Sequence, residues 1–535
     1  MQGVRSTRPD RAKSRDQGVA GESATAVPGS QSRSRLDWLV VAIPVLAELT
    51  VGGYRIGGPS LWRDEAATIS GSQRSFGEIL TMMGNEDAVH GPYYLLMHPV
   101  VAIGGISATA LRLPSLIAMC LAAGLTAALA RRLAASFGLP GAQAVGLIAG
   151  LALAAVPLTT RYAQEARPYA LATLFAVLAT YLLVRAAAEP RPARWALYSA
   201  ALLLTGLFNL FAVLVAVAHG VSLAWGLAAR DRVSAFRGWL MACVAAAILL
   251  APLAYLSAGQ ASQLNWVTRP DASTIASLLR DYAGAAVLIP VVGLLAVLGC
   301  FTGEGVRRGG GLTLGTVALP WLVLPPVLLI VASFVQPVYV ERYVVFCLPA
   351  LAMLIAAGLV WLAAATRRAL AAREPGARGA DALAIAPSAV LALVIVLAVI
   401  GPQGAIRQVG ARVDNLRAVA TAIAARERSG DAVLYLPRDA ALVGVAYPAP
   451  FRRLRDVGLG ESPVASATLR GTAASHSVIA ARLRDVGRLW TIQWASPLSR
   501  STAVPPSLAA LLTPLQPAGH WRIQSVLLRL YVRKR

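Results

Sequence analysis

Apolar residues fill most of this chain, and they come in long runs rather than in the alternating pattern of strands or the heptad pattern of coiled coils. A helix needs about 20 apolar residues to cross the hydrocarbon core of a bilayer. The runs predict eleven membrane spans, at residues 36–54, 111–133, 143–158, 168–187, 194–207, 208–229, 236–256, 283–302, 312–334, 343–366 and 383–402. The fifth span is short, so we expect it to be tilted or to form a partly inserted hairpin with the sixth at Phe208 and Asn209.

The segment before the first span and the loop after it have different patterns. Residues 1–34 are polar and rich in Arg, Ser and Gly, which predicts a disordered cytoplasmic tail and no cleavable signal peptide. In the loop 54–110, a capping-box pattern from Ser75 to Glu78 opens an apolar stripe with helical spacing. Pro92 suits the first position of a second helix. We therefore expect two helices that lie at the outer membrane surface.

The last part of the chain has a third pattern, because hydropathy falls after Pro402 and charged residues return. Residues 413–428 have a helical pattern, and residues 432–436, 488–494 and 521–532 have the pattern of strands. Residues 413–535 therefore predict a small α/β module. The whole chain predicts an all-α polytopic membrane domain at 35–402, followed by this extracytoplasmic module.

The distribution of charge supports a membrane domain followed by an extracytoplasmic module. The net charge is +23, but 57% of the residues are hydrophobic and only 14% are charged, which a soluble protein could not bury. The basic residues gather in every second loop, on the side of the N-terminal tail. This positive-inside distribution places the N-terminus in the cytoplasm and the C-terminal module outside, and it argues against nucleic acid as a partner. We expect a multi-pass protein of a bacterial inner membrane, in contact with lipid.

Two polar clusters stand in the first outer loop. Adjacent carboxylates at Asp64 and Glu65 could act as a general base or bind a cation. Their alternative role is to cap a helix, with Asp64 at the N-cap and Glu65 in the first turn. Further on, His90 could hydrogen-bond a sugar or a phosphate, with Tyr93 beside it. The alternative for this pair is a surface histidine and an interfacial tyrosine.

Arginines also occur in the outer loops, where the positive-inside rule should deplete them. Arg161 and Arg167 flank Glu165 in one short loop, and Arg342 precedes the tenth span. A guanidinium suits two-pronged contact with a phosphate. The alternative is a set of structural ion pairs with Glu165 or with the acids of the first outer loop.

These elements, in this order, resemble the GT-C glycosyltransferases, in particular the bacterial branch similar to protein O-mannosyltransferases and the aminoarabinose transferase of lipid A. The resemblance rests on Asp64 and Glu65, and on the motifs HGPYYLLMH at 90–98, LRLPS at 111–115, RYAQEARPYAL at 161–171 and ERYVVFCLPAL at 341–351. It covers about residues 36–400, and the Ala- and Arg-rich, Lys-poor composition is similar to that of actinobacterial members. His90 is followed by Gly91, which departs from the Lys/His-Pro-Pro pattern of the family.

The resemblance implies an enzyme that transfers a sugar from a polyprenyl-phosphate donor to an extracytoplasmic glycan, lipid or protein acceptor, with mannose favoured as the sugar and arabinose as the alternative. It implies that Asp64, with Glu65 beside it, activates the acceptor hydroxyl or helps to bind a metal. The arginines that would contact the donor phosphate are Arg161, Arg167 and Arg342. We expect further residues of the matching motifs to contact the substrate, namely His90, Tyr93, Gln164, Glu165, Tyr169 and Tyr343. A single displacement would invert the anomeric carbon.

Two other classes of protein fit parts of this pattern. A transporter or lipid flippase also places ionisable residues near membrane helices, but usually at mid-span and with inverted repeats, which this sequence does not display. The second is a GT-C-like scaffold without activity, and the intact Asp64 and Glu65 argue against it. The sequence leaves open the sugar, the acceptor, the role of the C-terminal module and the participation of a divalent cation.

Overall fold

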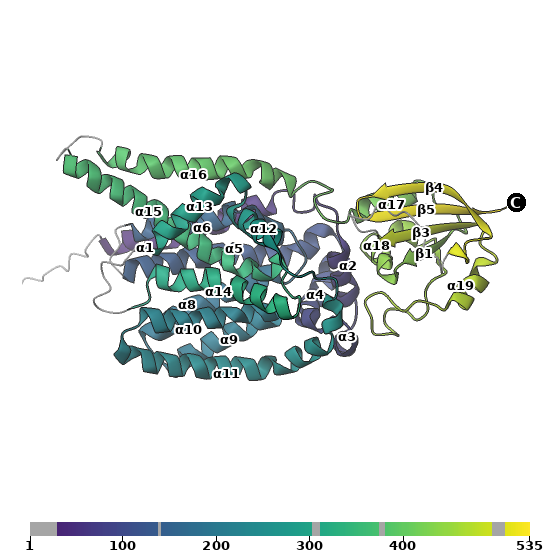
Figure 1. Ribbon diagram of the computed structural model, residues 1–535, viewed down its shortest axis with the longest axis horizontal. Helices are drawn as coiled ribbons and strands as arrows, with labels where there is room; N and C mark the ends of the chain where they lie inside the picture. Colours follow the sequence, from purple (N-terminus) through teal and green to yellow (C-terminus); the bar gives the residue numbers. More distant parts are fainter. Residues whose placement is uncertain (1–28, 137–140, 302–310, 374–379, 495–508, 535) are drawn as a thin grey trace, which may run out of the picture.

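The computed structural model describes residues 29–136, 141–301, 311–373, 380–494 and 509–534, and the statements below refer to these residues. A long helical bundle carries a smaller, sheet-containing module at one end (Figure 1). We call this end of the bundle the module end. Most of the predicted N-terminal tail lies outside the described residues. Helix α1 (Gly29–Gly53) begins inside it, however, so residues 29–34 are helical and not disordered as predicted.

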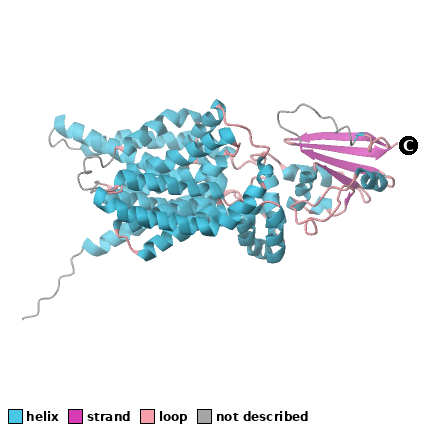
Figure 2. Cartoon of the chain, turned by 60° about the horizontal axis from the view of Figure 1, so that its bottom comes forward, coloured by secondary structure: helices cyan, strands magenta, loops and turns pink. Residues whose placement is uncertain are grey.

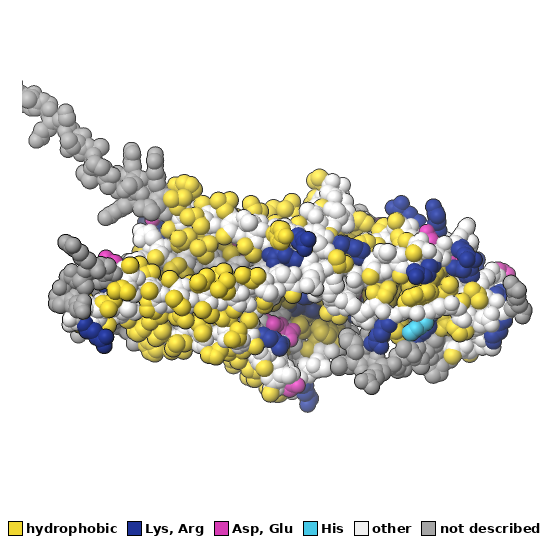
Figure 3. All heavy atoms as spheres, turned by 90° about the horizontal axis from the view of Figure 1, so that it is seen from above, with side chains coloured by type: hydrophobic (Ala, Val, Ile, Leu, Met, Phe, Trp, Pro, Cys, Tyr) yellow, Lys and Arg dark blue, Asp and Glu magenta, His cyan; other side chains and the backbone are white. Residues whose placement is uncertain are grey.

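The bundle consists of helices that match the predicted spans one by one (Figure 2). They are α1, α5 (Ala108–Ser136), α6 (Ala142–Ala155), α8 (Tyr169–Ala188), α9 (Pro192–Phe208), α10 (Val215–Gly226), α11 (Ala229–Gly259), α13 (Ile289–Cys300), α14 (Leu314–Val335), α15 (Leu348–Arg373) and α16 (Ala380–Ala405). The first three turns of α15 are completely enclosed by its neighbours, whereas α16 is mostly exposed. Figure 3 shows apolar side chains over the sides of the bundle and charged ones at its ends and on the module, which is the pattern of a protein surrounded by lipid.

Fewer helices pass a strict test of length and composition. Six of the described helices are long and apolar enough to cross a membrane, or eight if each bent pair forms one span. One pair joins α6 to α7 (Pro157–Ala163) at 67°, and the other joins α12 (Ala272–Ala283) to the segment Ala286–Cys300 at 82°. Pro157 explains the first bend, because it has no N–H to continue α6 and it pushes Val156 into an extended conformation. The number of eleven crossings stays a prediction.

The fifth and sixth predicted spans meet at the expected residues. Helix α9 ends at Phe208, and Asn209 is extended. The Asn209 side chain accepts a hydrogen bond from the N–H of Phe211 at 3.1 Å, which starts a 3₁₀ turn (Leu210–Leu214) before α10. The side-chain cap on this turn makes Asn209 the break between two helices.

Three short helices cover the module end of the bundle, where the sequence predicted two. Helix α3 (Phe76–Asn85) has the predicted capping box between Ser75 and Glu78, and α4 (Gly91–Gly104) has Pro92 in its first turn. The sequence offered the third helix, α2 (Arg63–Ser72), only as the alternative role of Asp64 and Glu65, and its N-cap residue is Trp62 rather than Asp64. Every residue of α2 from Glu65 onward is buried, but these residues are mostly Ala, Ser, Thr and Gly, so hydrophobic periodicity does not reveal the helix.

The module is built on a five-stranded sheet with the strand order β2-β1-β3-β5-β4. Strand β1 (Ala432–Leu436) pairs in parallel with β2 (Arg455–Asp456) and β3 (Arg488–Trp494). Strand β5 (Val526–Arg533) is antiparallel to both β3 and β4 (Leu515–Ile523). Three helices accompany the sheet, α17 (Leu416–Ala424), α18 (Leu442–Ala446) and α19 (His476–Leu483).

The strands β1 and β3 have the predicted bounds, but the single strand predicted at 521–532 is wrong. It is divided between β4 and β5 by a tight turn at Gln524 and Ser525. Gln524 has a φ of 50°, in the left-handed region that reverses the chain. The apolar residues Ile523 and Val526 on both sides of the turn hide it in a one-dimensional pattern.

Candidate active site

Helix α2 carries Asp64 and Glu65 in its first turn, and the two carboxylates have different surroundings. Glu65 is completely buried and forms a two-pronged ion pair with Arg112 of α5, with both N–O distances at 2.8 Å. Its Oε1 also accepts a hydrogen bond from the N–H of Ala166 at 3.0 Å. Burial alone would raise the pKa of Glu65, but Arg112 outweighs it, so the pKa lies below its ordinary value. Glu65 is an ionised anchor between α2, α5 and the loop before α8.

A second buried carboxylate, Glu165, lies in the same loop. Its Oε2 is 3.6 Å from Nε of Arg161 and 3.7 Å from Nη1 of Arg412. Burial raises the pKa of Glu165, and the charge of Arg412 works against this rise. We call Glu65, Arg112, Glu165 and Arg412 the paired cluster, because each charge has an opposite partner and none of the four side chains is more than 1% exposed.

Asp64 faces a partly open space instead. Its side chain is 19% exposed, and its Oδ2 lies 3.7 Å from Nη1 of Arg342, which is equally exposed. Two aromatic rings hold Arg342, whose Cζ lies 5.3 Å from the ring centre of Trp266 and 5.7 Å from that of Tyr343. A distance of 3.7 Å is too long for a hydrogen bond. The carboxylate and the guanidinium therefore keep hydrogen-bonding capacity for a ligand.

Arg167 reaches the same region from the loop before α8. Its Nη1 donates to the backbone oxygen of Asp64 at 3.4 Å, and its Nη2 donates to Nε2 of His90 at 2.7 Å. Since Nε2 accepts, the proton of the neutral ring is on Nδ1, which donates to Asp87 at 2.6 Å. Burial and the charge of Arg167 lower the pKa of His90, in agreement with a neutral ring. The Tyr94 hydroxyl donates to the other oxygen of Asp87 and completes the chain.

The structure thus brings together four of the predicted site residues, from α2, the turn before α4, the loop before α8 and the turn before α15. We call these four residues the open cluster: Asp64, His90, Arg167 and Arg342. Tyr169 and Tyr343 lie beside it, with ring centres 6.3 Å apart. Arg167 and Arg342 bring guanidinium N–H donors to this partly open space, so the open cluster is suited to an anionic group.

Other predicted site residues lie outside the open cluster. Gln164 is buried and donates to the backbone oxygens of Gly52 and Tyr54, so it holds the end of α1. Glu165 belongs to the paired cluster, and Arg161 is its ion-pair partner, which is the structural alternative that the sequence left open. Tyr93 is completely buried on α4. These four side chains therefore have structural contacts around the site and do not belong to the open cluster.

Several residues around the site were not singled out from the sequence. Tyr94 and Arg112 lie inside motifs that carried the resemblance, so attention to every polar position of those motifs would have found them. Asp87 appeared only as one acid of the first loop, and its φ of 57° is visible only in the structure. Arg412 lies after the last membrane helix, and its partner Glu165 is far away in sequence, so no local pattern reveals it.

A metal site does not fit the residues that are present. Within the described ranges, no group of three or more His, Cys, Asp or Glu side chains could hold a metal ion. Glu65 uses both oxygens on Arg112, which leaves Asp64 as a single carboxylate between two guanidinium groups. Two carboxylates that are adjacent in sequence therefore do not form the pair of ligands that the sequence suggested.

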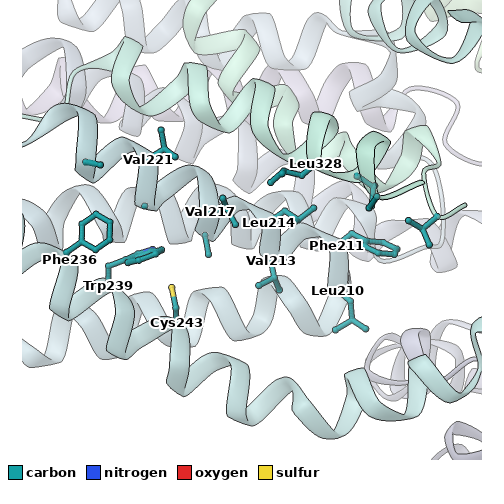
Figure 4. Close-up of a pocket in the computed structure, with 16 residues that line it drawn as sticks. Leu210, Phe211, Val213, Leu214, Val217, Val221, Phe236, Trp239, Cys243 and Leu328 are labelled. Atoms are coloured by element: carbon teal, nitrogen blue, oxygen red, sulfur yellow. The ribbon is translucent and has the colours of Figure 1, made fainter. Parts of the chain in front are cut away.

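An apolar groove of about 770 Å³ lies between α10, α11 and α14 (Figure 4). Its lining extends from Leu210 in the 3₁₀ turn to Ala224 in α10, which corresponds to about 20 Å along the chain. The ring centre of Phe211 lies 5.3 Å from that of Tyr343, which follows Arg342 in the chain. One end of the groove therefore lies next to the open cluster, and its lining would suit a hydrocarbon chain.

Comparisons with known proteins agree with this architecture. The family model of dolichyl-phosphate-mannose-protein mannosyltransferase matches residues 90–255. The chain is similar to the crystal structure of ArnT from Cupriavidus metallidurans in the apo state, with 15% identity and a TM-score of 0.56, over 93% of this chain and 98% of that chain. For ArnT bound to undecaprenyl phosphate, the identity is 14% and the TM-score 0.53, over 94% and 98% of the two chains. A comparison with curated proteins gives no match.

The chain therefore has the fold of ArnT, and the resemblance that the sequence predicted is confirmed at the level of the fold. The likeness to ArnT includes nearly the whole of both chains, so it extends over the C-terminal module as well as the bundle. The prediction of a helical membrane domain followed by a small α/β module is confirmed too.

Proposed function

We propose that this protein transfers a sugar from a polyprenyl-phosphate donor to an acceptor on the extracytoplasmic side of the membrane. One observation carries the proposal: a carboxylate between two arginines lies at the end of an apolar groove between membrane helices. A lipid-linked sugar phosphate has the same order of chemical groups, with a long hydrocarbon chain, an anionic phosphate and a sugar. The similarity in fold to ArnT bound to undecaprenyl phosphate supports the same class of lipid.

The phosphate of the donor would bind between Arg167 and Arg342. Both side chains come from the module end of the bundle, and the aromatic rings beside Arg342 limit its movement. Because the arginines are largely buried, their charges are less screened by water than charges on the surface. They would stabilise the negative charge that develops on the leaving phosphate. Arg161 is left out of this role, because it is paired with Glu165.

Asp64 would serve as the general base. The acceptor hydroxyl gives its proton to the Asp64 carboxylate, and its oxygen forms a bond to the anomeric carbon of the sugar. The bond from that carbon to the phosphate oxygen breaks, and its electron pair leaves with polyprenyl phosphate. One displacement of this kind inverts the anomeric carbon. Glu65 takes no part in the chemistry, because Arg112 and Ala166 already engage its carboxylate.

The arrangement of the helices supports an extracytoplasmic site. Helices α5, α8, α10 and α15 end, and α6, α9, α11 and α16 begin, at the end of the bundle away from the module (Figure 1). At or next to these helix ends the sequence has the arginine-rich segments that the positive-inside rule assigns to the cytoplasm. The open cluster and the module would then face outward, in a bacterial inner membrane. The name of the matching family model favours mannose as the sugar, with arabinose as the alternative.

The test is the release of polyprenyl phosphate from polyprenyl-phosphate mannose or arabinose by the purified full chain in lipid nanodiscs. A cell-envelope extract provides the acceptor, and each reaction is run with and without EDTA. We expect turnover of the mannose donor by the wild type, no effect of EDTA and no turnover by Asp64→Asn. Turnover of the arabinose donor alone would correct the sugar, and equal turnover by both proteins would remove Asp64 as the base.

The same preparation separates the rival classes of protein. A folded protein that binds polyprenyl phosphate but releases none from either donor would be an inactive GT-C scaffold. A protein that instead moves a labelled lipid-linked sugar across the bilayer of a vesicle would be a flippase. Both outcomes would overturn the proposed transfer.

A further inference from the structure

Helix α2, which carries Asp64, begins without a cap of its own. Its N-cap residue, Trp62, makes no side-chain hydrogen bond to the helix. The cap comes from a residue about 350 positions later: Oδ2 of Asp414 accepts a hydrogen bond from the N–H of Arg63 at 3.3 Å. The same carboxylate accepts two more from the Arg63 side chain, both at 2.7 Å. Asp414 therefore satisfies the first N–H of α2 and holds its first side chain.

The C-terminal module fixes both members of this pair. Asp414 is completely buried in the segment that leads into the module, and it accepts a hydrogen bond from the hydroxyl of Ser525 in the turn between β4 and β5. Cζ of Arg63 lies 4.6 Å from the ring centre of Trp494, at the end of β3. The start of α2 is thus attached to two separate points of the sheet.

Asp64 lies between two residues of α2 that are each held by another part of the protein. Successive residues of an α-helix are about 100° apart around its axis, so Arg63 and Glu65 lie on either side of Asp64. The module binds Arg63 through Asp414, and α5 binds Glu65 through Arg112. Rotation of α2 about its axis would break one of these two-pronged pairs. Together they direct the Asp64 carboxylate toward Arg342.

We propose that the C-terminal module is a positioning device for the reaction, in which Asp414, acting through Arg63, sets the direction of the Asp64 carboxylate. The inference rests on the proposed function of Asp64 as the base. Asp414 is a positioning residue, because it contacts α2 and not the open cluster.

The test compares two charge-neutralising variants of the same interface in the full chain. Asp414→Asn removes the charge that holds the start of α2. Glu86→Gln is the matched control: Glu86 pairs with Arg470 of the module at 2.5 Å, but at the end of α3 and not at the start of α2. For each variant, kcat and the KM for the donor are measured. Amide hydrogen exchange of residues 62–72 reports the stability of α2 without any substrate.

For Asp414→Asn, we expect kcat to fall by about 10- to 100-fold, because a small misplacement of a reacting group has an effect of this size. The KM for the donor should change by less than about twofold, since Arg167 and Arg342 are untouched. Exchange in 62–72 should be faster. Glu86→Gln should leave kcat and exchange in 62–72 close to those of the wild type. Ser525→Ala, which removes one hydrogen bond to Asp414, should show the same changes to a smaller extent and replaces Asp414→Asn if that variant does not fold.

Three results would overturn the proposal. Asp414→Asn could show the kcat and exchange of the wild type, Glu86→Gln could lose as much kcat as Asp414→Asn, or the KM could rise while kcat stays constant. A wild type that transfers no sugar contradicts the proposed function instead. In that case the exchange comparison still decides whether Asp414 stabilises the start of α2.

Discussion

The paired cluster and the open cluster contain the same kinds of residue and differ in their burial. In the paired cluster, no side chain is more than 1% exposed, and Glu65 makes two hydrogen bonds of 2.8 Å to Arg112. In the open cluster, the carboxylate of Asp64 and the guanidinium of Arg342 are each 19% exposed and lie 3.7 Å apart, while Arg167 donates to the backbone oxygen of Asp64 and to a neutral His90. The first arrangement holds helices together, and the second leaves hydrogen-bonding groups for a ligand. Asp64 and Glu65 show that adjacent residues can belong to different clusters.

The largest expected difference between the clusters is in catalysis. Asp64→Asn should lower kcat by about 10²- to 10⁴-fold, the usual contribution of a general base. The melting temperature in detergent should stay constant, because Asp64 makes one long ion pair and no side-chain hydrogen bond that α2 depends on. Turnover assays and thermal unfolding of the same preparation test both statements. A clear fall in melting temperature would place Asp64 with the anchors instead.

The second difference is in stability. Glu65→Gln leaves Arg112 without a charged partner in the interior, which should lower the free energy of unfolding by about 3–5 kcal/mol. The measurement is thermal or denaturant unfolding in detergent. Glu165→Gln is the matched control, since Glu165 is equally buried but its nearest guanidinium nitrogens are at 3.6 and 3.7 Å. Its loss should be smaller, and equal losses would contradict the distinction between hydrogen-bonded and distant pairs.

The third difference concerns lipid binding. Arg342→Gln should weaken the binding of polyprenyl phosphate by about 1.5–3 kcal/mol, the usual contribution of a hydrogen bond to a charged group. Arg161→Gln should leave the affinity nearly unchanged, because Arg161 is paired with Glu165 outside the open cluster. Binding of a fluorescent polyprenyl phosphate to the two variants in nanodiscs is the measurement. An equal loss for both would return Arg161 to the phosphate site.

The smallest expected effect is on the dependence of stability on pH. The pKa of His90 is lowered in the folded protein by burial and by Arg167, whereas in the unfolded chain it returns to about 6.5. Below that pH the unfolded chain binds more protons, so stability should fall with falling pH, by at most about 1.4 kcal/mol per pH unit. Melting temperatures at pH 7.5 and 5.5 test this, and His90→Gln should reduce the difference. A difference in melting temperature that is the same in His90→Gln and in the wild type would contradict a neutral His90.

Much of the bundle could be predicted from the sequence because each membrane helix satisfies its own backbone hydrogen bonds. Its position therefore depends on a local run of apolar residues, and all of the predicted spans coincide with helices. The capping box at Ser75 and the strands β1 and β3 could also be predicted, because each has a short residue pattern of its own along the chain. Helix α2 was not predicted along its length because its buried residues are mostly small and form no apolar stripe, and the turn at Gln524 was missed because apolar residues stand on both sides of it.

The types of residue at the site were also present in the sequence, since Asp64, Arg167 and Arg342 each stood where a membrane protein seldom places a charge. Only the tertiary structure decided which of them meet. Glu65 and Arg161 had the same local signals as Asp64 and Arg167, but they belong to partners on other helices. The attachment of α2 to Asp414 joins residues about 350 positions apart. The effect of a charge depends on its distance from other charges and on its burial. Both depend on how distant helices and strands pack together, which the sequence alone does not show.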